Sequence, residues 1–414
     1  MNKAKPFQID KRLVYEAYLK VKSNKGSSGV DGVTLEEFDR NLSGNLYRLW
    51  NRMSSGCYFP KAVRLVEIPK PNGGKRPLGI PTIEDRIAQM TVVMIITPML
   101  EAVFHEDSYG YRPNKSAHDA IAKAKERCLT NLWVLDMDIS RFFDTINHEL
   151  LMKAVRIHVK EKWILLYIER WLKVPYLEKD GNRIERTMGV AQGSVIGPVL
   201  ANLFLHYVFD KWMEVYQPAI PFERYADDII CHCRTEKQSL FLKSILTERF
   251  EKCGLTLNED KTRIVYCKTG TRRGNYKHTS FDYLGFTFRP RAARSSRTGR
   301  IYMMFTPAIS NKSKMKIRET IRTWSLNRQL QFKLGEIAEK YNPVILGWIH
   351  YYTKFGKSEF WQVMGYLNMR LSRWARKKYK KLKGGLKKAY TWLARVARRD
   401  SRIFSHWEKG YIPY

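Results

Sequence analysis

The chain has 414 residues, 44% of them hydrophobic and 13% aromatic, so it can bury sizeable cores and is not expected to be disordered. Its formal net charge is +34, and residues 291–414 alone hold 29 Lys and Arg against 6 Asp and Glu, a net +23. Aromatic side chains are interleaved with these cations, which suits a polyanion with bases to stack. No window approaches the ~20 apolar residues of a membrane-spanning helix. Composition therefore favours a nucleic-acid partner over a membrane.

The first 290 residues mix helical and strand patterns. Residues 11–22 have helical spacing and run into a Gly-rich loop at 24–34, and the apolar run 132–139 predicts a buried strand. Further elements are predicted in chain order: two strands within 62–82 around a turn at 71–74, helices at 83–104, 195–216 and 237–253, a strand–turn–strand at 222–233 and a strand at 281–288. Because buried strands and helices are mixed, the predicted fold class is α+β to about residue 290.

The pattern changes after residue 290. Residues 291–300 predict a basic linker or hairpin loop, and helices with Lys and Arg on their outer faces are expected from residue 301 onward. We therefore expect a helical domain at 301–365 and a small basic unit at 366–414, with a break at Lys383-Gly384-Gly385.

Six cysteines are scattered without paired spacing. Cys231, His232 and Cys233 alternate along an apolar run, so they would point to opposite faces of a strand and would not share one metal ion. Buried free thiols in a reducing compartment are expected instead. The first ten residues lack the apolar core of a signal peptide, which favours an intracellular protein.

Asp227 and Asp228 are adjacent carboxylates between two apolar runs. Buried like charges are unfavourable unless a cation lies between them, so the pair indicates either a metal site or an ordinary surface turn. Asp138 ends the apolar run 132–139 and favours the metal site. A third carboxylate at the end of a buried strand completes a ligand set for two Mg²⁺ ions, which activate a 3′-hydroxyl and steady a leaving pyrophosphate.

Basic and polar residues fit the same site. Lys70 and Arg76 flank a Gly-Gly turn six residues apart, so both can reach over a triphosphate, although an exposed basic hairpin has the same pattern. Gln192 precedes a helix, where free N–H groups suit a nucleotide base or template strand. Lys261 can neutralise a pyrophosphate and is equally plausible as a surface residue. Asp144 is expected to cap or orient the helix after the strand.

The motifs, taken together, resemble the reverse transcriptases encoded by bacterial group II introns, also called intron maturases. The segments that carry the resemblance are, in order, NKGSSGVDGVT, RLVEIPKPNGGKRPLGIPTIEDRIAQ, FHEDSYGYRPNKSAHDAI, DMDISRFFDTINH, AQGSVIGPVLANLFLH, YADD, GLTLNEDKT, FDYLGFTF and NPVILGWIHYYTKFG. So many ordered blocks are specific to this family, and they cover almost the whole chain. Two departures are Ala191 and Gly197, where the family usually has Pro and Ser, and altered loop stiffness is expected there.

The resemblance implies a right-hand polymerase. Fingers and palm would occupy residues 1–290, with an N-terminal extension at 1–50, and a helical thumb or maturase domain would occupy 301–365. Residues 366–414 would form a basic DNA-binding region. Many relatives continue into a Cys- and His-rich nuclease domain; no such cluster precedes Tyr414, so this chain is not expected to cut the second DNA strand.

By the same resemblance, Asp138, Asp227 and Asp228 would be the catalytic carboxylates and would bind two Mg²⁺ ions, for which Mn²⁺ can substitute. The residues implied to bind dNTP or template are Lys70, Arg76, Phe143, Gln192 and Lys261, with the Phe143 ring as a steric gate against the ribose 2′-hydroxyl. The residues implied to bind RNA or DNA are Lys25, Arg112, Trp348, Tyr351, Arg373, Arg376 and Lys377.

The implied partners are group II intron RNA, an RNA template with a DNA or RNA primer, target DNA and dNTPs, in a ribonucleoprotein of the bacterial cytoplasm. The implied function is to assist splicing of the intron and to copy it into DNA during retrotransposition. Three alternatives stay open: a non-catalytic RNA-folding factor, a domesticated enzyme of phage defence or CRISPR spacer acquisition, and an RNA-dependent RNA polymerase. Phe143 argues against the last, and the intact carboxylates argue against the first.

Overall fold

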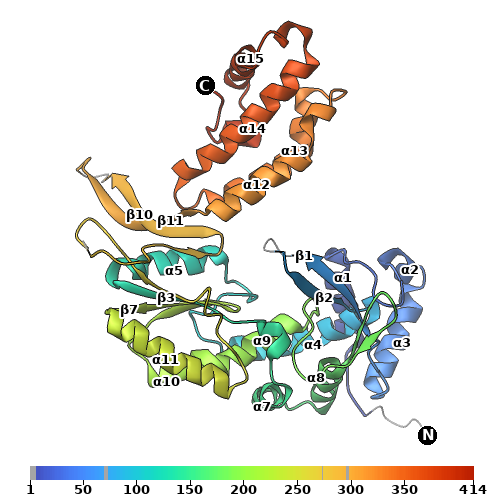
Figure 1. The fold of residues 1–414 in the computed structure, drawn as a ribbon. Coiled ribbons are helices and arrows are strands. Elements are labelled where there is room, and N and C mark those ends of the chain that lie inside the picture. The colour runs from blue at the N-terminus through green and yellow to red at the C-terminus, as the bar shows by residue number, and fades with distance from the viewer. Residues whose placement is uncertain (1–5, 70–72, 273, 295–297) are drawn as a thin grey trace. The chain divides into compact units, whose positions relative to one another are not determined.

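A computed structural model of the chain describes residues 6–69, 73–272, 274–294 and 298–414 (Figure 1). Within these ranges the chain divides into two compact units. The first consists of the described residues among 1–116, together with 135–231 and 236–263. The second consists of residues 117–134 and 232–235 and the described residues among 264–414. The architecture mixes helices and sheets, which confirms the predicted α+β class.

The N-terminal part of the first unit contains four helices and a small sheet. The helices are α1 (Lys11–Ser23), α2 (Leu35–Asp39), α3 (Leu42–Ser54) and α4 (Ile83–Glu101), and the sheet has the order β2 (Lys75–Ile80), β1 (Val63–Pro69), β4 (Tyr176–Leu177), β5 (Arg183–Ile184). β1 and β2 form the predicted antiparallel hairpin, in register from Arg64 with Ile80 to Pro69 with Lys75. The turn that joins them includes Lys70, which lies outside the described residues.

A second sheet carries the carboxylates. Its strand order is β6 (Phe222–Tyr225), β7 (Asp228–Cys233), β3 (Trp133–Asp138), β8 (Arg263–Tyr266). The other elements along this stretch are α6 (Phe142–Thr145), α7 (His148–His158), α8 (Lys162–Lys173), α9 (Gly197–Leu205), a π-helical turn (His206–Asp210), α10 (Lys211–Tyr216) and α11 (Glu236–Lys252). The ring of Phe209 in the π-helical turn packs against Phe222 of β6 at 4.8 Å and Phe250 of α11 at 6.2 Å between centroids. This apolar contact ties α11 to the edge of the sheet.

The second unit begins with α5 (Ala117–Thr130) and a three-stranded sheet of order β11 (Ile301–Ile309), β10 (Phe286–Arg294), β9 (Phe281–Tyr283). Its remaining helices are α12 (Asn311–Thr323), α13 (Leu334–Tyr352), α14 (Lys357–Lys378), α15 (Leu386–Arg399) and α16 (Ser405–Glu408). The prediction of helices from residue 301 is wrong for its first nine residues. They form β11, antiparallel to β10 from Ile301 opposite Arg294 to Ile309 opposite Phe286.

The predicted boundary at 365/366 falls inside α14, and one hydrophobic core runs from Ile309 to Tyr411. Asn368 of α14 joins the C-terminal residues to this helical core. Its amide donates to the Tyr411 carbonyl (3.0 Å), and its Oδ1 accepts from the Trp407 indole (2.9 Å). The basic C-terminal residues are therefore the outer face of one helical domain.

The cysteines are free, as predicted, and all except the exposed Cys57 are buried. No helix in the described part of the chain has the length and apolar character needed to cross a membrane.

Candidate active site

A tight hairpin presents the paired carboxylates. Tyr225 of β6 pairs with Asp228 of β7, so Ala226 and Asp227 form a two-residue turn. Ala226 has φ of 57°, in the left-handed region that such turns require. A residue with a side chain adopts this conformation at a cost of about 1–2 kcal/mol. The turn is therefore held by its surroundings, and it fixes the direction of the Asp227 side chain.

Asp138 ends β3, and the loop before β8 holds it in place. The Ser140 N–H donates to the Thr256 carbonyl and the Asn258 N–H donates to the Asp138 carbonyl, both at 2.8 Å. The same loop carries Lys261, whose Nζ donates to Asp138 Oδ2 at 2.8 Å. The Lys261 side chain is 60% exposed, so this ion pair is accessible to solvent and exchangeable.

Asp227 and Asp138 influence each other electrostatically. Burial raises the pKa of Asp227, and the Asp138 charge raises it further, against a lowering by a backbone N–H, Arg76 and Lys261. A carboxylate whose pKa is raised in this way gains stability from an added cation. Carboxylate oxygens are the ligands that Mg²⁺ prefers, so these residues fit a divalent ion by their chemistry.

Asp138, Asp227 and Asp228 do not form a compact group of three metal ligands in this structure. Among the described residues, no three His, Cys, Asp or Glu side chains stand close enough together to hold a metal ion. The Lys261 ammonium is the cation that Asp138 binds in this structure. A divalent ion bound by Asp138 would have to displace this ammonium. Asp227 is the carboxylate electrostatically linked to Asp138, and Asp228 is the first residue of β7.

Arg76 and Gln192 meet across 116 residues of sequence. Arg76 Nε donates to Gln192 Oε1 at 2.6 Å, and Gln192 Nε2 lies 3.4 Å from Asp144 Oδ1. The Gly79 N–H also donates to the Gln192 carbonyl at 2.7 Å, so β2 is fastened to the Gln192 loop. Asp144 therefore belongs to this polar chain, and its predicted role as a helix cap gives way to a contact with Gln192.

Phe143 lies in α6, between the end of β3 and the loop that carries Gln192. Its side chain is half-buried, and its carbonyl accepts from the Val190 N–H at 2.7 Å. The ring meets Phe142 edge-on, with centroids 5.4 Å apart. Packing against the buried Phe142 restricts the ring orientation, which a steric gate requires. Its role as a gate stays a prediction.

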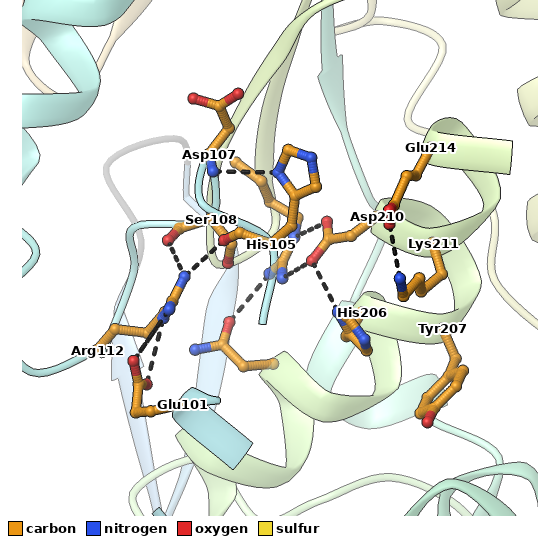
Figure 2. Close-up of polar contacts among 12 residues, drawn as sticks. Glu101, His105, Asp107, Ser108, Arg112, His206, Tyr207, Asp210, Lys211 and Glu214 are labelled. Carbon is orange, nitrogen blue, oxygen red and sulfur yellow. Dashed lines mark hydrogen bonds and ion pairs between the residues drawn. The ribbon is translucent and has the colours of Figure 1, made fainter. Parts of the chain in front are cut away.

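Arg112 is committed to the interior of the first unit (Figure 2). Its side chain is 6% exposed, and its guanidinium pairs with both Glu101 oxygens at 3.0–3.2 Å and with the carbonyls of His105 and Ser108 at 2.6 and 2.7 Å. With these acceptors bound, the guanidinium has little capacity left for a phosphate. We therefore assign Arg112 a structural role in place of the nucleic-acid contact implied by resemblance. Lys25 is exposed just after α1 and remains available.

The expected nucleic-acid residues of the second unit divide into two groups. Trp348 is half-buried and stacks on Trp324 at 5.5 Å, and the Tyr351 hydroxyl donates to the Leu284 carbonyl at 2.8 Å. These two aromatic residues support the packing of the domain. The cations Arg373, Arg376 and Lys377 are exposed on α14 and take part in none of the ion pairs found in the described ranges.

Two further residues near the turn that carries Asp227 were not predicted from the sequence. Arg224 and Asp210 are fully buried and paired with each other. The sequence does carry a signal for such a pair, because each of the two residues stands in an apolar run. A charged residue in that position is rarely buried without a partner of opposite charge.

Comparison with known proteins agrees with this geometry. Residues 68–288, more than half of the chain, match the family "Reverse transcriptase (RNA-dependent DNA polymerase)", and residues 314–392 match the "Group II intron, maturase-specific domain". The chain is 33% identical over 288 residues to Protein YkfC of Escherichia coli K12, over 60% of this chain and 75% of YkfC.

One further relative and one solved structure are also similar to the chain. The chain is 31% identical over 259 residues to the group II intron-encoded protein LtrA of Lactococcus lactis, over 61% of this chain and 42% of LtrA, so it spans less than half of that relative. A solved structure of telomerase from Candida albicans aligns with a TM-score of 0.49 and 12% identity, over 91% of this chain and 67% of that one. Reverse transcriptases use divalent metal ions. The family match establishes that this chain belongs to the reverse-transcriptase family and carries a group II intron maturase-specific domain.

Proposed function

We propose that this reverse transcriptase copies group II intron RNA into DNA, with two Mg²⁺ ions held by Asp138, Asp227 and Asp228, and that it assists splicing of the same RNA. The observation that carries the proposal is the Asp138–Asp227 pair, in which burial and mutual repulsion raise the pKa of Asp227 beside a replaceable lysine ammonium. When bound, the ions would lower the pKa of the primer 3′-hydroxyl and neutralise charge on the leaving pyrophosphate.

The protein residues around this pair would bind and orient the nucleotide. Arg76 is exposed and held by Gln192, so its remaining N–H groups can contact triphosphate oxygens. Lys261 pairs through Nζ with Asp138, and the same ammonium can neutralise a pyrophosphate oxygen once it is displaced. Phe143 would exclude an oxygen at the ribose 2′ position. Lys70 would join Arg76 on the triphosphate.

The exposed cations of α14 support the proposal that the second unit binds nucleic acid. Arg373, Arg376 and Lys377 lie on the last two turns of a helix whose opposite side, including Trp374, is buried. Phosphate neutralisation is the general basis of nucleic-acid affinity. We propose that this face binds intron RNA or target DNA, within a ribonucleoprotein in the bacterial cytoplasm.

Primer extension tests the enzymatic half. Purified protein with Mg²⁺, dNTPs and a primed RNA template should yield full-length cDNA, and Asp227→Ala should abolish the product. Absence of cDNA from the wild-type protein would point to a non-catalytic RNA-binding factor. Preferential use of NTPs would point to an RNA polymerase. Accelerated splicing of a group II intron RNA, retained by Asp227→Ala, tests the maturase half separately.

A further inference from the structure

A buried ion pair contacts the turn that carries Asp227. Arg224 Nε and Nη2 donate to the two carboxylate oxygens of Asp210 at 2.7 and 2.6 Å, and both side chains are 0% exposed. Burial would raise the pKa of Asp210, but the Arg224 guanidinium and His206 hold it below its ordinary value. The pair is therefore charged. Two charges taken out of water are unfavourable unless further hydrogen bonds complete the arrangement.

The third guanidinium nitrogen makes those bonds. Arg224 Nη1 donates to Asn202 Oδ1 at 2.9 Å and to the carbonyl of Ala226 at 3.2 Å. The Ala226 carbonyl belongs to the left-handed turn that carries Asp227. Asn202 in turn donates from Nδ2 to the Gly110 carbonyl at 2.6 Å. One buried guanidinium thus links a helix, the residue before the metal-binding carboxylates and the segment around Gly110.

The helix is shaped for this contact. Asn202 and Asp210 are eight residues apart, and in a regular α-helix such residues point about 80° away from each other. The π-helical turn at His206–Asp210 places more residues in one turn and so brings both side chains to the same guanidinium. π-helical turns are rare and concentrate at functional sites.

Gly110 closes the turn from the other side. A Cβ at Gly110 would stand 2.5 Å from the Ala226 backbone nitrogen, so only glycine permits the observed approach. Two hydrogen bonds fix the separation: the Tyr109 N–H donates to the Arg224 carbonyl at 2.8 Å, and the Arg224 N–H donates to the Asp107 carbonyl at 2.9 Å. The turn is therefore enclosed between a buried cation and a neighbouring backbone.

We propose that Arg224 is a positioning residue for nucleotide transfer: its guanidinium, fixed by Asp210 and Asn202, holds the Ala226 carbonyl and so sets the direction of Asp227. The proposal rests on the function proposed above for Asp227. It assigns Arg224 no contact with substrate or metal. Loss of the clamp should therefore lower the maximal rate of nucleotide insertion while leaving template and dNTP binding intact.

The test compares Arg224→Lys with Gly110→Ala. Lysine keeps the charge but cannot form the two-pronged pair with Asp210 and also reach Ala226, and the added methyl group pushes the turn without touching the ion pair. Single-turnover insertion of one dNTP on a primed RNA template should slow by about 10²-fold in both variants, the loss expected for a displacement near 1 Å. The dissociation constants of dNTP and of template–primer should stay within about twofold. Binding of Mn²⁺ in the absence of dNTP, followed by electron paramagnetic resonance, should weaken in both.

Arg170→Gln serves as the control for lost stability, because Arg170 Nη1 also donates to backbone carbonyls, at Gly56 (2.9 Å) and Tyr58, and has no contact with the turn. It should lower the melting temperature and leave the insertion rate unchanged. An insertion rate within twofold of wild type in folded Arg224→Lys would overturn the proposal. If Arg224→Lys does not fold, an insertion rate within twofold of wild type in Gly110→Ala would overturn the proposal instead. Absence of insertion by the wild-type protein would instead refute the proposed function.

Discussion

The contact between β2 and the Gln192 loop makes a quantitative prediction for Gly193→Ala. Gly193 has φ of +99°, and a Cβ there would lie 2.6 Å from the carbonyl oxygen of Gly79, a backbone atom that cannot swing aside. Ordinary contact begins at 3.4 Å, so the two backbones must separate by about 0.8 Å. The 2.7 Å hydrogen bond from the Gly79 N–H to the Gln192 carbonyl would then stretch beyond hydrogen-bonding distance.

The consequence is a loss of alignment between Arg76 and Gln192, which are joined by a 2.6 Å hydrogen bond. A displacement of this size slows a positioned reaction by about 10- to 100-fold, or about 1.4–2.7 kcal/mol in the barrier. Gly181→Ala is the matched control. Gly181 has φ of +90° and nothing within 4 Å, so it shares the left-handed backbone cost of about 1–2 kcal/mol without the clash.

The assay is pre-steady-state insertion of one dNTP on a primed RNA template, measured over a range of dNTP concentrations. Both variants should lose thermal stability from the left-handed backbone cost, Gly193→Ala more because of its added clash, and only Gly193→Ala should lose rate and apparent dNTP affinity. Equal insertion kinetics in the two variants would refute the role of the β2–Gln192 contact.

Three further outcomes follow from single residues. Phe143→Ala should raise incorporation of NTP relative to dNTP by at least about tenfold, since the ring no longer excludes the 2′-hydroxyl. Unchanged selectivity would refute the role of Phe143 as a steric gate. Asp85 is buried and its pKa is raised to about 6 by burial, against hydrogen bonds from Tyr58, Trp171 and Gln89. Because the raised pKa favours the protonated form in the folded state, its contribution to stability is present below pH ~4 and is lost as the pH rises to ~6. The free energy of unfolding falls by about 3 kcal/mol in total, and about half of that decrease occurs between pH 5 and 8. Urea unfolding over this range should show the decrease in the wild-type protein and not in Asp85→Asn. Replacing Arg373, Arg376 and Lys377 together by Gln should reduce the slope of log affinity for RNA against log salt by about 2, and an unchanged slope would exclude this face from phosphate contact.

Local sequence pattern was sufficient to predict the hairpin that carries Asp227 and Asp228. Two apolar runs around Asp227 and Asp228 predict a strand–turn–strand, and the run ending at Asp138 predicts a buried strand; both elements are observed. These strands are buried along almost their whole length, so each appears in the sequence as a continuous apolar run that can be recognised without the fold.

Contacts between distant residues could not be predicted in this way. Lys261 meets Asp138 across 123 residues and Arg76 meets Gln192 across 116, and neither pair has a local signature. β11 was missed for a related reason. Its buried residues begin only at Phe305, and its nine-residue pairing with the basic strand β10 exists only in the folded domain.

The burial of charged side chains could not be predicted from the sequence either. Arg112 looked like a cation available for RNA, yet its guanidinium is enclosed with Glu101. Arg224 looked unremarkable inside an apolar strand, yet it supports the turn that carries Asp227. Whether an arginine is paired inside or free outside depends on acceptors contributed by other elements.

The most direct measurement of the central claim is Mg²⁺-dependent insertion of one dNTP opposite an RNA template by Asp138→Asn, Asp227→Asn and Asp228→Asn. Each change keeps the size of the side chain and removes the charge. Loss of roughly 4 kcal/mol of metal-mediated stabilisation predicts a rate at least about 10³-fold below wild type, with template–primer affinity unchanged. Asp260→Asn, at an exposed carboxylate next to Lys261, should stay within twofold. Insertion by Asp138→Asn or Asp227→Asn within tenfold of wild type would contradict the account.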